Sequence, residues 1–243
     1  GGIFPPNITV GVDVGKSVNS TVITGWSREK SMGDVGKEDI ARLVYIEEIN
    51  PRSGGHDIPY QRRRIIDVCH MLGADKLIVD CTGIGGAIEQ DLRIECINSS
   101  PQIHFLPFVF TGGPRGSKTQ IYRDYVSYVQ QDRIKIPNPE KLPAPIKRLV
   151  MKWYAEHRDL EYTMDAANKT ERIAAPDGKH DDYCDSSVMG IHATLSILPG
   201  SATFTSTNRG GGRRFQKASR TYGKTGVFTT SARKAGINKG IPL

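Results

Sequence analysis

The chain has 243 residues and a formal net charge of +7 at pH 7, from 33 basic and 26 acidic side chains. This length suits a globular protein with one large domain or two small ones. The longest apolar stretches, such as residues 103–110, are far shorter than the roughly 20 residues that a membrane-spanning helix needs, and the start GGIFPP lacks the basic and apolar regions of a secretory signal, so we expect neither membrane association nor secretion.

The first part of the chain has the pattern of a β-hairpin and a third strand. Residues 8–14 alternate apolar and β-branched side chains, residues 15–20 form a turn, and residues 21–26 and 41–49 again have strand character. A helix is predicted over residues 60–72, because its apolar side chains fall on one side and a glycine follows.

Helices and strands then alternate. Residues 77–80 are nearly all apolar, which favours a strand covered on both faces. The later predicted elements are a helix over 87–92, a strand over 103–110, a helix over 118–131, a short strand over 133–136, a helix over 144–157, edge-strand segments at Tyr162 and 172–175, and a helix over 180–195. This order predicts an α/β fold with a mixed sheet that has helices on both faces.

The C-terminal part of the chain is strongly basic. From residue 186 onward there is no acidic residue and there are nine basic ones, including Arg213 and Arg214 in a glycine-rich run. We expect residues 1–198 to form the folded domain and residues 199–243 a flexible tail, because the tail has too little apolar surface to offset its ordering entropy. The tail is interpreted either as an arm that binds nucleic-acid phosphates or as a solubilising or protein-docking segment.

Four cysteines are spread along the chain without a CxxC pair or a partner histidine at zinc-site spacing. We expect them to be reduced and to pack in the core, since cysteine is among the most buried residue types.

Aspartates end two predicted strands and begin the last helix. Asp13 and Asp80 follow apolar runs, and the segment HDDYCD contains Asp181, Asp182 and Asp185. A sheet can bring these carboxylates to one point, where they would demand a cation. Mg²⁺ and Mn²⁺ prefer oxygen ligands, and two such ions about 4 Å apart assist phosphodiester hydrolysis. We therefore predict a catalytic set in which Asp13 bridges two ions, Asp80 holds one and Asp182 holds the other.

Asp181 and Asp185 compete with Asp182 as metal ligands. On a helix that begins near Asp181, positions 182 and 185 share a face and position 181 points elsewhere. Asp182, supported by Asp185, is therefore preferred, with Asp181 as an alternative.

The motifs VGVDVG, LIVDCTGIG, a KTQ helix leading into RIKIP, and GKHDDYCDS occur in this order. Over residues 8–198 the chain resembles the C-terminal nuclease domain of the large terminase subunit of tailed bacteriophages. That resemblance implies an RNase H-like fold and Mg²⁺- or Mn²⁺-dependent cleavage of concatemeric viral DNA during packaging in the host cell cytoplasm. It places Asp13, Asp80 and Asp182 (or Asp181) on metal-binding positions and Lys118 near DNA. The partners it implies are double-stranded DNA, an N-terminal ATPase domain, the small terminase subunit and the portal protein.

Full large terminases carry an ATPase motor with a P-loop. The nearest segment here, residues 11–17, is one residue short of that motif, so we expect an isolated nuclease domain. Basic residues near the predicted site are candidates for DNA phosphate contacts: Lys16, Arg115 and Lys118, with Arg213 and Arg214 in the tail.

Three alternatives remain. The segment VDVGK before a hairpin also resembles the first phosphate loop of actin-like ATPases and sugar kinases, although this chain is too short for their two domains. A Holliday-junction resolvase or a transposase-like enzyme would share the acidic residues and prefer another form of DNA. A DNA-binding packaging module without enzymatic activity is the third alternative.

Overall fold

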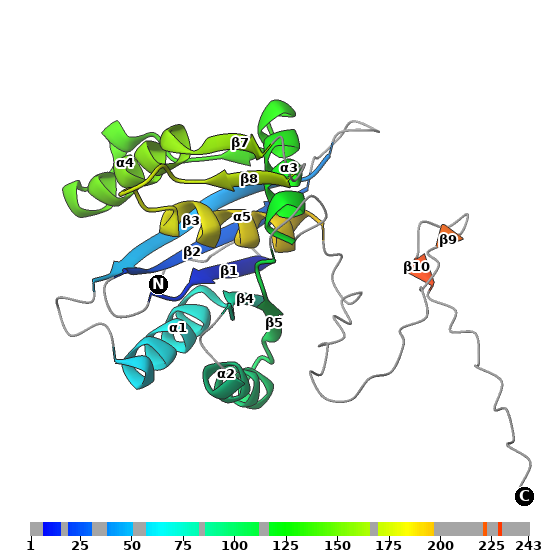
Figure 1. Ribbon diagram of the computed structural model, residues 1–243. Coiled ribbons are helices and arrows are strands. Elements are labelled where there is room, and N and C mark those ends of the chain that lie inside the picture. Colours follow the sequence, from blue (N-terminus) through cyan, green and yellow to red (C-terminus); the bar gives the residue numbers. More distant parts are fainter. Residues whose placement is uncertain are drawn as a thin grey trace, which may run out of the picture. The chain divides into compact units, whose positions relative to one another are not determined.

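A six-stranded mixed sheet forms the centre of the protein (Figure 1). The computed structural model describes residues 7–15, 19–30, 38–50, 57–82, 86–111, 117–165 and 170–196, with two short strands near the C-terminus. The strand order is β5-β4-β1-β2-β3-β6. The strands are β1 (Ile8–Asp13), β2 (Thr21–Glu29), β3 (Ile40–Ile49), β4 (Lys76–Asp80), β5 (His104–Phe108) and β6 (Ile134–Lys135). Strands β1, β2 and β3 pair antiparallel, whereas β4 and β5 extend the sheet from β1 in parallel and β6 pairs in parallel with β3.

Helices cover both faces of this sheet. Figure 1 shows α1 and α2 on one face and α3, α4 and α5 on the other. The helices are α1 (Ile58–Leu72), α2 (Gly86–Asn98), α3 (Ser117–Gln130), α4 (Ala144–Asp159) and α5 (Asp182–Leu195). The predicted α/β architecture is confirmed, and the main difference is that α2 continues to Asn98 instead of ending at residue 92.

The side chains of strand β1 point alternately to the two faces of the sheet. Ile8, Val10 and Val12 are fully buried in a hydrophobic cluster with side chains of α1 and α2. Because successive side chains of a strand point to opposite faces, Gly11 and Asp13 belong to the face that α5 covers. The alternation in the sequence therefore decides that the carboxylate of Asp13 lies on the α5 side.

The segment between α4 and α5 forms a ribbon of its own. Strands β7 (Glu161–Asp165) and β8 (Thr170–Ala174) pair antiparallel with each other and, among the described residues, with no strand of the main sheet. Tyr162 and residues 172–175 were predicted as edge-strand segments, and most of them do lie in strands. Their partner differs because strands close in sequence pair readily with each other, which the local pattern does not reveal.

The chain divides into two compact units, Gly1–Ile197 and Leu198–Leu243. In the second unit the structure describes only strands β9 (Thr221–Tyr222) and β10 (Phe228–Thr229), which pair antiparallel. The predicted tail therefore lies almost entirely outside the described residues. Within the described part of the chain, no helix has the length and apolar character that a bilayer crossing needs.

The four cysteines are buried and free, as predicted. Burial raises the pKa of Cys81 to about 12, so this thiol stays protonated at neutral pH. Burial raises the pKa of Cys184 as well, and a buried thiol that stays protonated is a packing group rather than a nucleophile.

Candidate active site

Asp13 and Asp80 end adjacent parallel strands at the same edge of the sheet. In the register of β1 and β4, Gly11 is opposite Ile78 and Val12 is opposite Val79. The next pair along the two strands is Asp13 and Asp80. Because parallel strands run in the same direction, both carboxylates emerge at one end of the sheet.

Two glycines bring helix α5 into contact with β1. A Cβ atom added to Gly11 would lie 2.4 Å from the carbonyl oxygen of Ser186, and one added to Gly190 would lie 2.5 Å from a ring carbon of Trp26. Only residues without a side chain allow this approach. The hydroxyl of Ser186 donates to the carbonyl of Gly11 at 2.9 Å, which fixes the helix on the strand.

The close packing of α5 on β1 places the first turn of the helix beside the two strand ends. Asp181 is the N-cap residue of α5, and Asp182 and Asp185 lie in its first turn. Asp182 and Asp185 are buried, with exposed fractions of 9% and 7%. Carboxylates from β1, β4 and α5, far apart in sequence, are therefore gathered at one end of the sheet.

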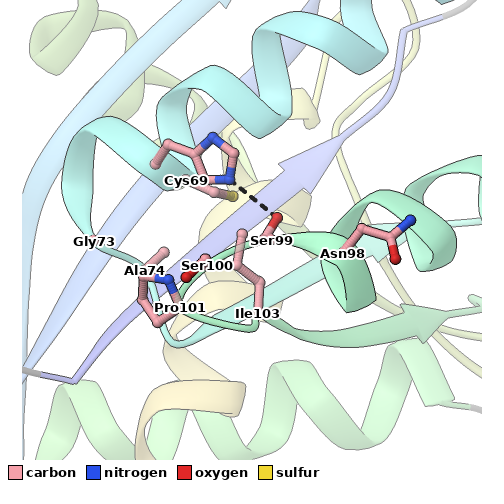
Figure 2. A pocket seen from close by; sticks show the side chains of 9 residues that line it. Cys69, Gly73, Ala74, Asn98, Ser99, Ser100, Pro101 and Ile103 are labelled. Carbon is pink, nitrogen blue, oxygen red and sulfur yellow. Dashed lines mark hydrogen bonds between the residues drawn. The ribbon is translucent and has the colours of Figure 1, made fainter.

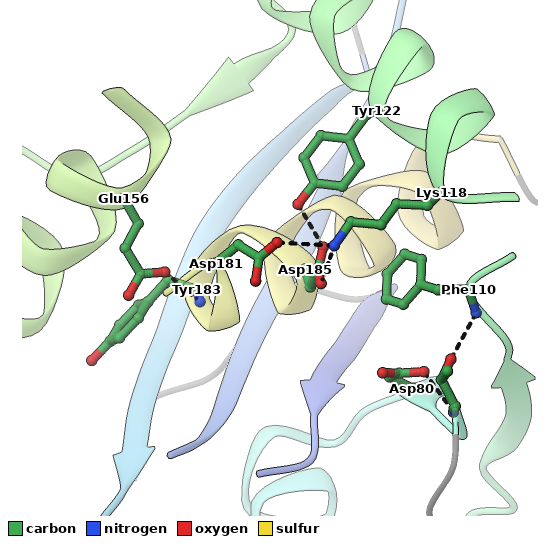
Figure 3. A network of polar contacts seen from close by, with 9 residues as sticks. Asp80, Phe110, Lys118, Tyr122, Glu156, Asp181, Tyr183 and Asp185 are labelled. Carbon is green, nitrogen blue, oxygen red and sulfur yellow. Dashed lines mark hydrogen bonds and ion pairs between the residues drawn. The ribbon is translucent and has the colours of Figure 1, made fainter. Parts of the chain in front are cut away.

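Lys118 of α3 bridges two of the α5 carboxylates (Figure 3). Its Nζ atom lies 2.9 Å from Oδ2 of Asp181 and 2.8 Å from Oδ2 of Asp185. Tyr122, one turn further along α3, donates its hydroxyl to Oδ1 of Asp185 at 2.5 Å. The prediction that Asp181 points away from Asp185 is wrong: positions i and i+4 of this helix start meet at the same lysine.

These carboxylates lie close enough to repel one another. Burial raises the pKa of Asp13 well above its ordinary value, and repulsion by Asp185, Asp182, Asp80 and Asp181 raises it further. Burial also raises the pKa of Asp182 to about 6, against the opposing effect of His180. The pKa of Asp185 is raised to about 6 by burial although Lys118 opposes the shift. A group of carboxyls that resist ionisation together is typical of a functional site.

The carboxylate oxygens suit a hard divalent cation, but in this structure they do not surround one ion-binding position. Among the described residues, no three His, Cys, Asp or Glu side chains are arranged to hold one ion. The ammonium group of Lys118 instead supplies the positive charge between Asp181 and Asp185. Carboxylate oxygens that repel one another around Asp13 are nevertheless the chemistry that Mg²⁺ and Mn²⁺ require, so the residues present fit such an ion.

No protein-family model and no curated protein sequence matches the chain. Among solved structures, the nuclease domain of the large terminase subunit gp2 of bacterial virus Sf6 matches with 13% identity and a TM-score of 0.52, over 78% of this chain and 89% of that chain. A lysine-to-alanine mutant of that domain with manganese and beta-thujaplicinol matches with 12% identity and a TM-score of 0.53, over 79% and 90% of the two chains. A mutant of bacteriophage Sf6 gp2c with calcium matches with 13% identity and a TM-score of 0.52, over 76% and 88%.

The chain has the RNase H-like fold of a terminase nuclease domain.

Within this terminase-type fold, a network that the sequence did not reveal fixes Asp80. The backbone N–H of Thr82 donates to Oδ1 of Asp80 at 2.7 Å, and the Thr82 hydroxyl accepts from the N–H of Phe110 at 2.8 Å. Figure 3 shows these contacts linking the end of β4 to the segment that follows β5. Asp80 is thus held in place by the loop that follows its own strand.

The sequence patterns also did not identify two glutamates of this chain that lie near the acidic site. Glu48 of β3 is opposite Val22 of β2, which is itself opposite Asp13, so Glu48 lies in the same cross-strand row as Asp13. Glu48 is paired with Lys152 of α4 at 2.6 Å. Glu156 of α4 accepts the N–H of Tyr183, and burial raises the pKa of Glu156 to about 8. Only the strand register and the packing of α4 show that these residues approach the acidic site.

The basic residues that the sequence suggested for DNA contact differ in where the structure places them. Lys118 belongs to the acidic site itself. Lys16, Arg115, Arg213 and Arg214 lie outside the described residues. In the basic start of α1, Arg62 pairs with Asp91 and Glu95, and Arg64 pairs with Glu47 at 2.9 Å.

A separate pocket lies at the other end of strands β4 and β5, away from the aspartates (Figure 2). Its volume is about 200 Å³, and Ala74 and Ile103, which precede β4 and β5, contribute to its lining. His70 and Ser99 are hydrogen bonded at 3.0 Å in its wall, but the Ser99 hydroxyl also donates to the carbonyl of Glu95. The single hydroxyl proton of Ser99 is therefore directed at the Glu95 carbonyl and not at His70, where the proton of a nucleophilic serine would point.

Proposed function

We propose that this protein is a metal-dependent endonuclease that cleaves double-stranded DNA, of the kind that terminases use to cut viral DNA during packaging. The single observation that carries this proposal is the gathering of Asp13, Asp80 and the first turn of α5 at one end of an RNase H-like sheet. The solved Sf6 nuclease domains with manganese or calcium support the use of a divalent metal.

The aspartates are assigned separate roles. Asp13, Asp80 and Asp182 would be the catalytic ligands of Mg²⁺ or Mn²⁺, with Asp181 and Asp185 in support. Two such ions supply the activation of a water molecule and the stabilisation of the leaving oxygen. The surrounding contacts orient the ligands: Thr82 holds Asp80, and Tyr122 holds Asp185.

Phosphate contacts would come from the basic residues around the site. Lys16, Arg115 and Lys118 are proposed to contact the DNA backbone near the cut, and Arg213 and Arg214 to contact it from the tail. Contacts with phosphates position DNA and carry no sequence information, so cleavage should show little sequence preference. By family resemblance, an N-terminal ATPase domain, the small terminase subunit and the portal protein would be its partners in the host cell cytoplasm.

Deletion of residues 200–243 is expected to weaken DNA binding and to flatten its salt dependence. The tail carries nine basic residues and no acidic one, and each phosphate contact adds about 0.9 to the slope of log K against log salt on duplex DNA. Binding titrations at several salt concentrations measure this slope. An unchanged slope would exclude the tail as a phosphate-binding arm and favour docking to a protein.

Incubation with plasmid DNA tests the enzymatic function directly. Nicking and linearisation of supercoiled plasmid are expected with Mg²⁺ or Mn²⁺. No cleavage is expected with EDTA. Linear duplex and four-way junction substrates of equal length are then compared, because a resolvase would prefer the junction. DNA binding without cleavage in either metal would leave a non-enzymatic packaging module as the better description.

A further inference from the structure

The first turn of helix α5 does not receive the usual cap from its own N-cap residue. The first N–H groups of any helix have no partner within the helix and need acceptors from elsewhere. Asp181 is the N-cap residue, yet its side chain makes no capping hydrogen bond. Its carboxylate is instead turned to Lys118. An aspartate that would normally cap the helix is thus engaged in the acidic site.

Glu156 of helix α4 supplies an acceptor for this turn. The N–H of Tyr183 donates to Oε2 of Glu156 at 2.8 Å, as Figure 3 shows. Tyr183 follows Asp182 directly and lies within the turn that also carries Asp185. The hydrogen bond therefore holds the backbone between two of the proposed metal ligands.

Helix α4 is itself firmly anchored beside α5. Trp153 is 5% exposed, and its Nε1 atom donates to the hydroxyl of Ser187 at 2.8 Å. Lys152 is paired with Glu48 of the sheet. Trp153 and Glu156 are three residues apart and share one side of α4. The carboxyl of Glu156 is consequently presented to α5 by a rigid support.

We propose that Glu156 is a positioning residue, which caps helix α5 from the neighbouring helix and so directs Asp182 and Asp185 toward Asp13. This inference rests on the proposed function for the role of those aspartates, whereas the cap itself does not depend on it. Glu156 acts through the backbone of Tyr183 and is not assigned as a metal ligand.

Amide hydrogen exchange of Tyr183, measured by NMR without metal or DNA, tests the cap. Glu156→Ala is expected to speed this exchange by about five-fold, the change that loss of a helix cap produces. Glu156→Gln keeps a side-chain carbonyl acceptor and is expected to stay within about two-fold of the wild type. Met151→Ala, at a 50% exposed position of the same helix, is the control and should leave the Tyr183 exchange unchanged.

Cleavage assays then test positioning. In Glu156→Ala the Mn²⁺ concentration for half-maximal cleavage should rise about five-fold, with the rate at saturating Mn²⁺ changed less, and Glu156→Gln should restore the wild-type value. If Glu156→Ala does not fold, Glu156→Asp replaces it, because its shorter side chain withdraws the acceptor and keeps the carboxyl group.

Two results would overturn the inference. One is Tyr183 exchange in Glu156→Ala equal to that in Met151→Ala. The other is Glu156→Gln as impaired as Glu156→Ala, which would assign the effect to the carboxyl group itself and not to its role as acceptor. A wild-type protein that does not cleave DNA would refute the proposed function alone, since the exchange measurement still decides whether Glu156 caps the helix.

Discussion

Asp13→Asn is expected to abolish metal-dependent cleavage and, at the same time, to stabilise the metal-free protein. Cleavage should fall by more than the ~10–100-fold that is typical of residues that only support a metal ligand. The melting temperature without metal should rise by roughly 2–4 °C, the shift that about 1 kcal/mol produces in a domain of this size. The gain arises because the Asp13 carboxylate is buried and is also repelled by Asp185, Asp182, Asp80 and Asp181, and the neutral amide removes both penalties.

The pH dependence of this stabilisation gives a sharper test. A carboxyl whose pKa is raised in the folded state contributes stability at pH values below its unfolded pKa, and that contribution is lost as the pH rises through the folded value. The pKa of Asp13 is raised well above 3.8. The difference in melting temperature between Asp13→Asn and the wild type should therefore be small near pH 4 and should grow toward pH 7.

Asp67→Asn on the exposed side of α1 is the matched control for these measurements. It makes the same chemical change away from the acidic site and should leave both cleavage and melting temperature nearly unchanged. Metal-dependent nicking by a clean preparation of Asp13→Asn would refute the assignment of Asp13. A melting temperature that falls at pH 7 would show that Asp13 is not under repulsion in the folded protein.

Lys118→Ala is expected to destabilise the metal-free protein and to make it more dependent on divalent metal. Burial by itself lowers the pKa of Lys118, but the carboxylates of Asp185 and Asp181 raise it overall, so the ammonium group stays charged. Its removal leaves the buried carboxylate of Asp185 and the half-buried carboxylate of Asp181 without their cation. We expect a loss of about 1–3 kcal/mol in the free energy of unfolding, between the values for exposed and fully buried ion pairs.

Thermal unfolding with and without Mn²⁺ measures this effect. Mn²⁺ should raise the melting temperature of Lys118→Ala more than that of the wild type, because the ion replaces the missing positive charge. Lys147→Ala removes the exposed ion pair with Glu140 and is the control, with an expected change below ~1 kcal/mol. An equal Mn²⁺-induced shift in Lys118→Ala and the wild type would show that the lysine does not occupy the place of a cation.

The sequence correctly predicted that Asp13 and Asp80 lie at the ends of strands, because the residues before them have clear strand patterns. Apolar residues alternate before Asp13 and run continuously before Asp80, and these patterns indicate where the strands end. No local sequence pattern indicates the role of Gly11. Its role as the contact point for Gly190 and Ser186 depends on a helix nearly 180 residues further along the chain, and no local pattern encodes such an approach.

The acidic helix start was predicted less well. Helical spacing separated Asp181 from Asp182 and Asp185, but Lys118 draws Asp181 and Asp185 together. Glu48 and Glu156 were overlooked because a glutamate within a strand or an amphipathic helix is usually a surface residue. Their importance arises from the register of β3 and from the packing of α4 on α5.

The sequence by itself determined the α/β class, the ends of β1 and β4, and the residue types that can bind a hard cation, since periodicity and side-chain chemistry are local properties. Tertiary structure alone decided which carboxylates meet, which lysine balances them and which glutamate holds the helix that carries two of them. The physical reason is that charge interactions and helix capping depend on distances of a few ångströms, and only the packing of α3, α4 and α5 on the sheet sets those distances.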